Sequence, residues 1–378
     1  MEIKNIPFNK PYLSGKETDY LNQSVANGHI SGNGPFTKKC QDFFEKRWGF
    51  KKCLLTTSCT DALEMCALLL NINDADEVII PSFTFVSTAL AFSRQGAKIV
   101  FADSQAEHPN LDPNHIEELI TPKTKAIIVV HYAGIACDMD EIMRIADKHK
   151  LIVIEDAAQC IDSYYKDKPL GSFGHLSCFS FHETKNIQCG EGGMLAINDE
   201  QFIQRAEIIW EKGTNRAKFF RGEIDKYGWV DTGSSFLISD LLASFLFAQL
   251  ENLDRIQQKR LNIWSHYLEK LKPLEEKGFI KLPEILPYAS NNAHMFFILM
   301  NSIEERTRLI KHLRSKQILA VFHYQSLHKS KYMKALGNNQ ELKNSDYFEE
   351  CLLRLPLYYE LNEADQDYII KSIFNFFE

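Results

Sequence analysis

The first two hundred residues alternate between short apolar runs and segments of helical character, and this alternation restricts the fold more than any other feature. The runs are CLLT at 53–56, EVIIP at 77–81, KIVFAD at 98–103, AIIVVH at 126–131 and LIVIED at 151–156. Apolar runs of this length are typical of strands that are buried on both faces of a sheet. Their regular interleaving with helices predicts parallel pairing and helices over both faces. We therefore expect an α/β domain with a mainly parallel sheet.

The character of the sequence changes after about residue 200, and this change predicts a second domain. Later strands are expected at 175–181, 193–198, 295–300 and 320–324, the first two joined by a glycine-rich turn. The segment 238–271 is expected to form one long or broken helix, and a final helix is expected near 363–377. We place the division so that residues 1–255 form the large α/β domain and residues 256–378 a smaller α+β domain.

The composition indicates where the protein is located and which classes of partner it is not dedicated to. The 43 basic and 50 acidic residues give a net charge of −7, which argues against a protein dedicated to nucleic acid or to a membrane surface. The N-terminus has no apolar run that resembles a signal peptide, and no later stretch approaches a membrane span. The nine cysteines include no CxxC pair. We expect a cytoplasmic protein.

Several common motifs are absent, and their absence narrows the chemistry. The sequence contains no GxGxxG after a strand, no Walker lysine loop and no HExxH. His323 and His328 lie five residues apart, a spacing that does not suggest a metal site. We predict no metal, and interpret His323 and the adjacent Tyr324 as candidates for contact with substrate.

The segment TTSCTDAL at 56–63 is the first candidate binding element. A strand ends there, a polar turn follows, and a buried helix begins. Free backbone N–H groups at a helix N-terminus suit a phosphate. Simple capping of the helix by Ser58 or Thr60 explains the same residues, so this segment alone leaves both readings open.

The segment LIVIEDAAQ at 151–159 places two acids at the end of a predicted strand. Glu155 and Asp156 are adjacent, so they point to opposite faces and cannot act as a glycosidase pair. A buried strand-end carboxylate needs a cationic partner, and a protonated heterocyclic nitrogen is one candidate. A salt bridge to a nearby arginine is the other.

The segment FSFHETKN at 179–186, followed by CGEGG at 189–193, places Lys185 in a loop between two predicted strands. A lysine whose pKa is lowered by burial can form a Schiff base. Most loop lysines are solvated surface groups, so this segment alone does not show whether Lys185 forms a Schiff base. An anion-binding helix start, a strand-end acid and a loop lysine, in that order, are together typical of a pyridoxal-phosphate enzyme.

The sequence resembles the DegT/DnrJ/EryC1/StrS family of sugar aminotransferases over nearly its whole length. The resemblance is carried by motifs that include LLTTSCTDALEM, PSFTFVSTA, VVHYAG, EDAAQ, SCFSFHETKN, GEGG, EKGTNR, NAHMF, AVFHY and LLRLPL. It implies the aspartate-aminotransferase-like fold (pyridoxal-phosphate fold type I) and pyridoxal 5'-phosphate as the cofactor.

The resemblance also implies roles for individual residues. Lys185 would bind the cofactor covalently, Asp156 would pair with its pyridine nitrogen, and Gln159 with its phenolic oxygen. Phe85 would stack on the ring. The phosphate would be held by Cys59, Thr60, Ser180 and Ser235. Cys59 stands where many members carry Gly, Ser235 where many carry an Asn that reaches a neighbouring subunit's phosphate, and Leu237 where many carry Arg.

The reaction that the resemblance implies is transamination of a nucleotide-linked sugar. Within the family, the sequence is most similar to members that make dTDP-4-amino-4,6-dideoxygalactose for surface polysaccharide, by moving an amino group from L-glutamate to C4 of dTDP-4-keto-6-deoxy-D-glucose. Family members usually dimerise, which implies a homodimer with the active site at the interface. Two alternatives stay open: a transaminase acting at C3 or on another nucleotide-linked ketosugar, and a non-enzymatic regulator that binds pyridoxal phosphate.

Residues 211–229 are expected to contribute to the nucleotide-sugar site. The segment holds five basic residues and three acids, so it is locally positive on an acidic protein. Lys212, Arg216 and Arg221 are candidates for the diphosphate, and arginine suits a two-pronged contact. The aromatic residues of the segment are candidates for stacking on thymine: Phe219, Phe220, Tyr227 and Trp229. A solvated loop whose aromatic residues pack inward is the alternative.

Overall fold

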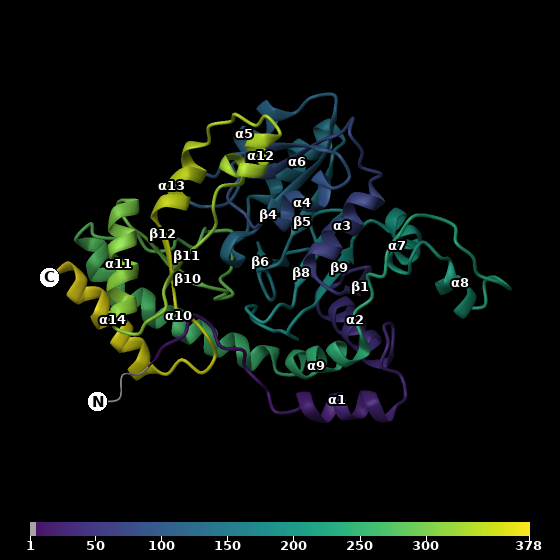
Figure 1. Ribbon diagram of the computed structural model, residues 1–378, viewed down its shortest axis with the longest axis horizontal. Helices are drawn as coiled ribbons and strands as arrows, with labels where there is room; N and C mark the ends of the chain where they lie inside the picture. The colour runs from purple at the N-terminus through teal and green to yellow at the C-terminus, as the bar shows by residue number, and fades with distance from the viewer. Residues whose placement is uncertain (1–4) are drawn as a thin grey trace.

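The computed structural model describes residues 5–378. Figure 1 shows a large sheet flanked by helices, with a smaller sheet and its own helices beside it. No helix within the described range is long and apolar enough to cross a membrane.

The large sheet has seven strands, most of them parallel. In spatial order they are β1 (Lys52–Thr56), β9 (Gly193–Ile197), β8 (Leu176–Ser180), β5 (Ile152–Asp156), β4 (Thr124–Val130), β2 (Glu77–Pro81) and β3 (Lys98–Ala102). All pairs from β8 to β3 are parallel. The five early apolar runs are all strands of this sheet, as predicted.

One prediction about this sheet is wrong. The run at 53–56 was expected to pair in parallel, but β1 pairs antiparallel with β9. Because β9 is also antiparallel to β8, β1 still runs in the same direction as β8. The chain turns back after β8 and inserts β9 between two strands that would otherwise be neighbours. The expected glycine-rich connection between these two strands is residues 181–192, which contains Lys185.

The strands bury both faces of the sheet against helices. Leu55 and Ile127 join the core on one face, and their neighbours Leu54 and Ile128 join the core on the other, because successive side chains alternate. The first face is covered by α2 (Pro35–Trp48), α6 (Met139–His149) and α9 (Asp240–Leu250). The second is covered by α3 (Cys59–Leu69), α4 (Ser87–Ser93) and α7 (Ile203–Trp210).

The smaller sheet has three antiparallel strands, in the order β10 (Phe296–Leu299), β12 (Leu352–Leu355) and β11 (Val321–Phe322). Its core is completed by α10 (Leu253–Glu276), α11 (Ile303–Ser315) and α14 (Glu363–Phe377). The broken helix expected at 238–271 corresponds to α9 and α10. The proposed division between residues 255 and 256 lies in the first turn of α10, and it stays a prediction.

Two segments connect the two cores across that division. Ile6 packs in the core of the smaller sheet, where its backbone bridges to Ile318. Leu327 and Met333, which come after the division in the chain, pack in the core beside the large sheet. A separate cluster that includes Tyr132 and Phe297 fills the junction between the two cores.

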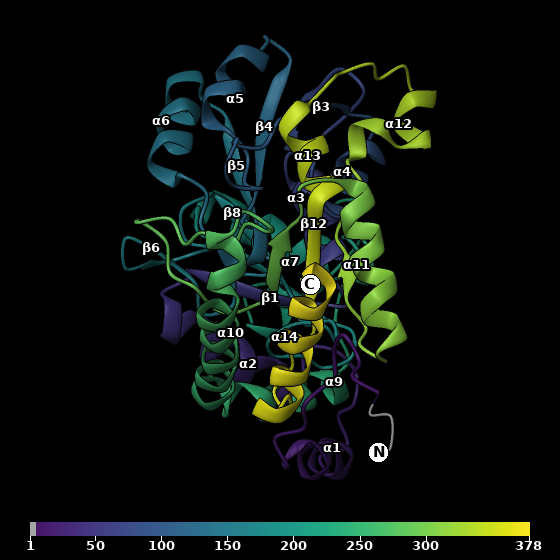
Figure 2. The same cartoon turned by 90° about the vertical axis from the view of Figure 1, so that its left-hand side faces the viewer.

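The remaining elements lie at the periphery. They are α1 (Glu17–Ala26), α5 (Pro113–Leu119), α8 (Arg216–Phe220), α12 (Lys331–Ala335), α13 (Lys343–Cys351), the two-stranded sheet of β6 (Tyr164–Tyr165) and β7 (Lys168–Pro169), and 3-10 helices at Tyr132–Gly134, Glu200–Phe202 and Leu327–Lys329. Figure 2 shows α1 at one end of the molecule and α5, α6 and α12 at the other. The segment around α8 projects from the body in Figure 1.

Candidate active site

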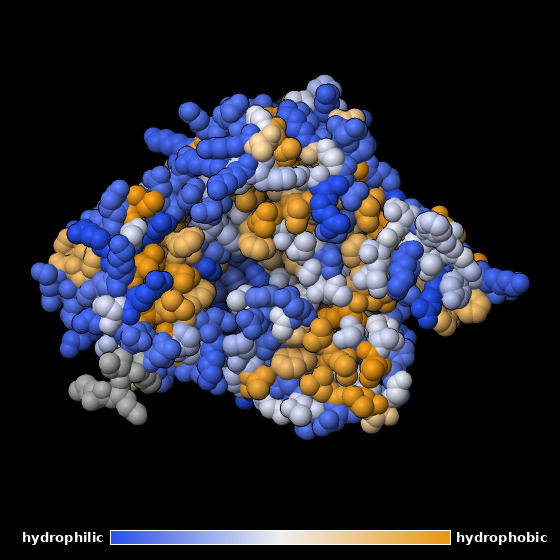
Figure 3. Space-filling view, viewed as in Figure 1, coloured by the Kyte–Doolittle hydropathy of each residue, from blue (hydrophilic) through white to orange (hydrophobic). Residues whose placement is uncertain are grey.

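The carboxyl ends of β1, β5 and β8 lie at one edge of the large sheet, because the three strands run in the same direction. Three of the predicted segments follow these strand ends: Cys59 and Thr60 after β1, Asp156 at the end of β5, and Ser180 at the end of β8. This edge faces the junction with the small domain, and Figure 3 shows that the surface is hollowed between the two. The topology therefore brings these residues to one place.

Asp156 is buried at the end of β5 and has two hydrogen-bond donors. The hydroxyl of Thr88 donates at 2.7 Å, and the backbone N–H of Ala158 donates at 3.2 Å. Burial raises the pKa of Asp156, and these hydrogen bonds and the positive charge of Lys185 oppose that rise. No arginine pairs with Asp156 within residues 5–378, so the salt bridge considered as an alternative is absent there.

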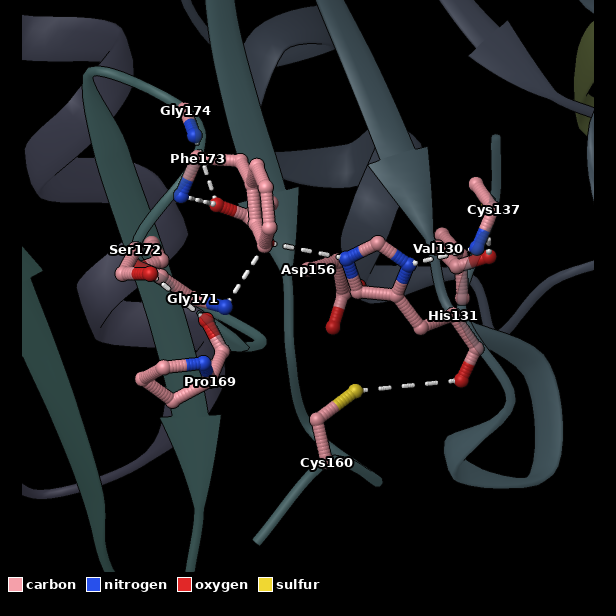
Figure 4. Close-up of polar contacts among 12 residues, drawn as sticks. Val130, His131, Cys137, Asp156, Cys160, Pro169, Gly171, Ser172, Phe173 and Gly174 are labelled. Carbon is pink, nitrogen blue, oxygen red and sulfur yellow. Dashed lines mark hydrogen bonds and ion pairs between the residues drawn. The ribbon is translucent and has the colours of Figure 1, made fainter. Parts of the chain in front are cut away.

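Glu155 points to the opposite face of β5 and accepts hydrogen bonds from His131, Gly171, Phe173 and Gly174. Figure 4 shows these four partners gathered on one side of β5. The Glu155 oxygens accept the three backbone N–H groups at 2.6–2.8 Å. His131 Nδ1 accepts the N–H of Cys137, so its proton is on Nε2, which donates to Glu155 at 3.0 Å. Glu155 therefore fixes the loop after β7, and Asp156 is the acid that remains for a ligand.

Lys185 lies in segment 181–192, close enough to Asp156 and Cys59 for their charges to act on it. Burial lowers the pKa of Lys185, and those two neighbours oppose the fall. Its backbone N–H donates to the carbonyl of His182 at 2.9 Å, which fixes a tight turn. A lysine in this setting is more readily deprotonated than a surface lysine, and so it can act as a nucleophile or a base.

The start of α3 offers free donors to an anion. Ser58 caps the helix by accepting the N–H of Asp61 at 3.0 Å, whereas the N–H groups of Cys59 and Thr60 have no acceptor within the described chain. The hydroxyl of Thr60 donates to Ser87 at 2.7 Å. A Cβ on Gly193 would lie 2.3 Å from the nitrogen of Cys59, so only glycine lets β9 pass this close. Capping of the helix by Ser58 is therefore observed, and the anion site at TTSCTDAL stays a prediction.

Gln159, His323 and Tyr324 form a polar group at the junction of the domains. Gln159 accepts the N–H of Ala133 at 2.6 Å and donates to the hydroxyl of Tyr324 at 3.1 Å. His323 stacks on Tyr324 at 3.5 Å between ring centroids. Tyr324 has a φ of 43°, a conformation that is uncommon outside glycine and often marks a functional site.

Phe85 precedes α4 and is 56% exposed. Its ring centroid lies 6.2 Å from that of Tyr324, so it faces the same hollow. A large aromatic side chain left exposed at a buried strand-end site is available to stack on a flat ligand.

Ser235, Lys212 and Arg216 lie together in a second place, a pocket of about 550 Å³ that also includes Lys38 and Phe220. Ser235 is adjacent to Phe236, whose carbonyl accepts the N–H of Thr57, so the pocket lies just beyond the start of α3. Arg221 does not line this pocket, and it pairs with Glu207 and Glu223. Of the predicted stacking residues, only Phe220 lines the pocket.

Three further residues lie near Asp156 and Lys185 and had no role assigned from the sequence: Thr88, His294 and Arg354. Thr88 contacts Asp156, while the charges of Lys185 and Arg354 both act on His294. The sequence contained one signal for Arg354, which is a charged residue inside the apolar run LLRLPL. Thr88 carried none, because its contact with Asp156 joins two distant segments.

The residues present fit the predicted pyridoxal 5'-phosphate. Asp156 is a buried carboxylate that has no cation within hydrogen-bond distance among residues 5–378, and such a carboxylate suits a pyridinium nitrogen. The free N–H groups at Cys59 and Thr60 suit its phosphate. Lys185 supplies the amine.

Comparisons with known proteins agree with this geometry. The chain is 32% identical to the uncharacterized protein MJ1066 of Methanocaldococcus jannaschii, over 97% of this chain and 96% of that protein. It is 29% identical to the spore coat polysaccharide biosynthesis protein SpsC of Bacillus subtilis, over 97% and 96% of the two chains. The putative sugar aminotransferase Spr1654 of Streptococcus pneumoniae in its PMP form superposes with a TM-score of 0.92, at 26% identity, covering 99% of this chain and 98% of that one.

These findings confirm three predictions. The fold is the predicted α/β aminotransferase fold. Spr1654 has also been solved in a PLP form, and the cofactor predicted from the sequence is confirmed as pyridoxal phosphate. The sequence profile of the DegT/DnrJ/EryC1/StrS aminotransferase family matches residues 11–374. With nearly the whole chain matched, the protein belongs to the DegT/DnrJ/EryC1/StrS aminotransferase family.

Proposed function

We propose that the protein is a cytoplasmic homodimer that moves an amino group from L-glutamate to C4 of dTDP-4-keto-6-deoxy-D-glucose, giving dTDP-4-amino-4,6-dideoxygalactose for surface polysaccharide. The observation that carries the transamination is that Lys185 and Asp156 are buried at one edge of the sheet, near enough for the charge of each to act on the pKa of the other. Within the described part of the chain Asp156 has no cation within hydrogen-bond distance, and the pKa of Lys185 is lowered by burial. The choice of sugar is supported by the sequence motifs and by the pocket beside Ser235.

Asp156 would hold a proton at the pyridine nitrogen of the cofactor. When bound, the cofactor supplies a ring that accepts electrons from the carbon bearing the amine. Thr88 and the N–H of Ala158 fix the orientation of the Asp156 carboxylate. Gln159 would donate its amide N–H to the phenolic oxygen, and Phe85 would cover the ring.

Lys185 would move the proton. Its Nζ would take the proton from the carbon that bears the amine and deliver it to the neighbouring position. Burial favours this role because it stabilises the neutral amine, which is the basic form. The phosphate would lie against the N–H groups of Cys59 and Thr60, with hydroxyls from Thr60 and Ser180 nearby.

The pocket of about 550 Å³ would receive the nucleotide and diphosphate of the sugar substrate. Its volume is within the range of small-molecule sites. Lys38, Lys212 and Arg216 supply positive charge, and Phe220 supplies an aromatic face. Arg216 lies 3.5 Å from Glu211, a weak contact that a diphosphate can replace.

The proposed homodimer rests on apolar surface. Figure 3 shows apolar side chains gathered over the region of α9, where Leu241 and Phe245 are only partly buried. In the projecting segment around α8, Trp229 is 84% exposed and Tyr227 is 51% exposed. Exposed apolar areas of this kind mark interaction surfaces. Ser235, at the pocket beside this segment, would then complete a phosphate site at the interface.

The test is product analysis. The purified protein is incubated with L-glutamate and a panel of nucleotide-linked ketosugars, and the carbon that carries nitrogen is identified by nuclear magnetic resonance. We expect the dTDP-linked 4-keto sugar to be consumed fastest and nitrogen to appear at C4. Nitrogen at C3, or a preference for another nucleotide, would contradict the sugar assignment. A protein that only binds the cofactor would show no turnover with glutamate.

A further inference from the structure

The side chain of Asn186, the residue after Lys185, is buried in a network of hydrogen bonds. Its Nδ2 donates to Oε1 of Gln257 and to the backbone carbonyl of Asn292, both at 2.8 Å. Its Oδ1 accepts from Nδ1 of His294 at 2.9 Å. The nitrogen and the oxygen of the amide therefore both have partners, as a buried amide requires.

These partners allow the Asn186 amide only one orientation. A backbone carbonyl can only accept a hydrogen bond, so the amide nitrogen must face Asn292 and the amide oxygen must face His294. His294 therefore has its proton on Nδ1. Burial and nearby positive charges lower the pKa of His294, so the ring is neutral. Asn186 is thus held by uncharged groups in a defined geometry.

The turn that provides two of these partners is itself fixed. Arg260 of α10 donates to the carbonyls of Ala293 and His294 at 3.0 and 2.7 Å. Ala293 has a φ of 49°, which is uncommon outside glycine and persists only where the surroundings determine it. The side chains of the network are between 1% and 8% exposed: Asn186, Gln257, Arg260, Asn292 and His294. Asn186 is therefore joined to a well-fixed turn before β10.

Asn292 also holds the segment that carries Gln159. Its Nδ2 donates to the carbonyls of Gln159 and Ile161 at 2.7 and 2.9 Å. The backbone of Asn292 thus binds the residue after Lys185, while its side chain binds the loop after β5. Lys185 and Gln159, which the proposed reaction uses at the same cofactor, are therefore tied to one turn of the chain.

We propose that Asn186 is a positioning residue that holds Nζ of Lys185 where it meets the reacting carbon. The inference rests on the proposed transamination, and it names how the proton carrier of that reaction is kept in place. Lys185 is fixed on its other side by a backbone turn, because its N–H donates to the carbonyl of His182 at 2.9 Å. The lysine stem is flexible, so a main chain that is fixed on both sides narrows the region that Nζ reaches. A displacement of about 1 Å in the reacting groups can slow a reaction about 100-fold.

Asn186 acts through Lys185 and not on the substrate. Each polar atom of its side chain is used within the chain, and the side chain is 6% exposed. A change at Asn186 should therefore alter the rate of the reaction and leave the affinity for the amino acid as it was.

Asn186→Ala removes these hydrogen bonds and leaves Lys185 and Asp156 in the chain. In the half-reaction with L-glutamate, followed by the change in cofactor absorbance, we expect the limiting rate to fall about 10- to 100-fold. The half-saturating concentration of L-glutamate should stay close to that of the unchanged protein. Gln257→Met removes one partner and keeps Asn186, so its loss of rate should be smaller. In the Asn186→Ala background it should add little, because both changes break the same contact.

Cofactor binding gives a measurement that needs no turnover. In the cofactor-free chain, the attachment of pyridoxal 5'-phosphate to Lys185 can be followed by absorbance, and Asn186→Ala should slow it by a factor comparable to that of the half-reaction. 4'-Deoxypyridoxine 5'-phosphate lacks the aldehyde and cannot attach to a lysine, so its Kd reports the rest of the cofactor site. We expect that Kd to be the same in Asn186→Ala and in the unchanged protein.

Asn198→Ala is the matched control. Asn198 also donates two hydrogen bonds through Nδ2, to the carbonyls of Gly171 and Gly174 at 2.7 and 2.8 Å. It follows β9, which is antiparallel to β8, so it lies at the opposite edge of the sheet from the proposed site. Its loss should lower the melting temperature and leave the limiting rate and the attachment rate unchanged.

A purely structural Asn186 would behave like Asn198, with a lower melting temperature and normal rates per folded molecule, and that result would overturn the proposal. Weaker binding of 4'-deoxypyridoxine 5'-phosphate in Asn186→Ala would also overturn it, because the whole cofactor site would then be disturbed. If the unchanged protein does not react with L-glutamate, the proposed transamination fails. The attachment rates of pyridoxal 5'-phosphate would still decide the role of Asn186.

Discussion

The hydroxyl of Thr88 donates a 2.7 Å hydrogen bond to Asp156, which lies 68 positions later in the chain. Thr88 belongs to the first turn of α4, whereas Asp156 ends β5. The contact orients the carboxylate and opposes the rise in its pKa that burial causes. Four of the predictions below concern this site.

Replacing Thr88 should weaken catalysis without removing the acid. Thr88→Val keeps the shape but removes the donor, so the pKa of Asp156 should rise and the carboxylate should hold the pyridine nitrogen less well. We expect turnover to fall about tenfold, in line with one hydrogen bond to a charged group. Thr88→Ser should restore most of the rate. A Thr88→Val variant with the rate and pH profile of the unchanged protein would show that the contact only supports packing.

Asp156→Asn should keep the fold and nearly abolish turnover. The amide is similar in shape but cannot stabilise a positive charge on the pyridine nitrogen. Steady-state kinetics and circular dichroism of the purified variant test this directly. Turnover at the rate of the unchanged protein would remove Asp156 from the site.

Lys185→Ala should be inactive, because one change removes both the covalent link to the cofactor and the proton carrier. Positioned acid–base catalysis alone contributes about 10²–10⁴-fold. The unchanged protein, reduced with borohydride and digested, should show a pyridoxyl adduct on Lys185 by mass spectrometry. An adduct on a different lysine would overturn the site assignment.

The cofactor-free protein should also report the buried amine through its stability. The pKa of Lys185 is lowered in the folded state, so the unfolded chain binds the proton more tightly. The free energy of unfolding should therefore rise, relative to Lys185→Met, as pH increases through the lowered pKa toward the ordinary lysine value. Thermal melts of both proteins between neutral and alkaline pH measure the difference. A difference that is constant with pH would mean that the pKa of Lys185 is not lowered.

Arg216 and Arg221, both candidates for the diphosphate, should now behave differently. Arg216 lines the pocket beside Ser235, whereas Arg221 pairs with Glu207 and Glu223 outside it. Arg216→Ala should raise KM for the ketosugar about tenfold or more, and Arg221→Ala should leave it unchanged. The reverse result would place the diphosphate outside this pocket.

Much of the sheet and part of the site could be predicted from the sequence, because local patterns carry them. Apolar runs mark the buried strands, and a parallel sheet gathers its strand ends, so Asp156 and the start of α3 were found from their positions. The position of β9 was missed because strand order depends on pairing between distant segments. The same limit hid Thr88. For Arg221, the structure adds the ion pairs with Glu207, fourteen positions earlier, and with Glu223, two positions later.

The backbone of Ile6 pairs with Gln317 and Leu319 at the edge of the small domain. During synthesis, the partners of Ile6 are made roughly three hundred residues after it. The segment around Ile6 must therefore wait, unpaired, while the large sheet is completed, and the small domain can close only when the last third of the chain has left the ribosome. Nascent chains arrested before residue 317 should accordingly remain open to protease near Ile6, and chains released at full length should be protected there.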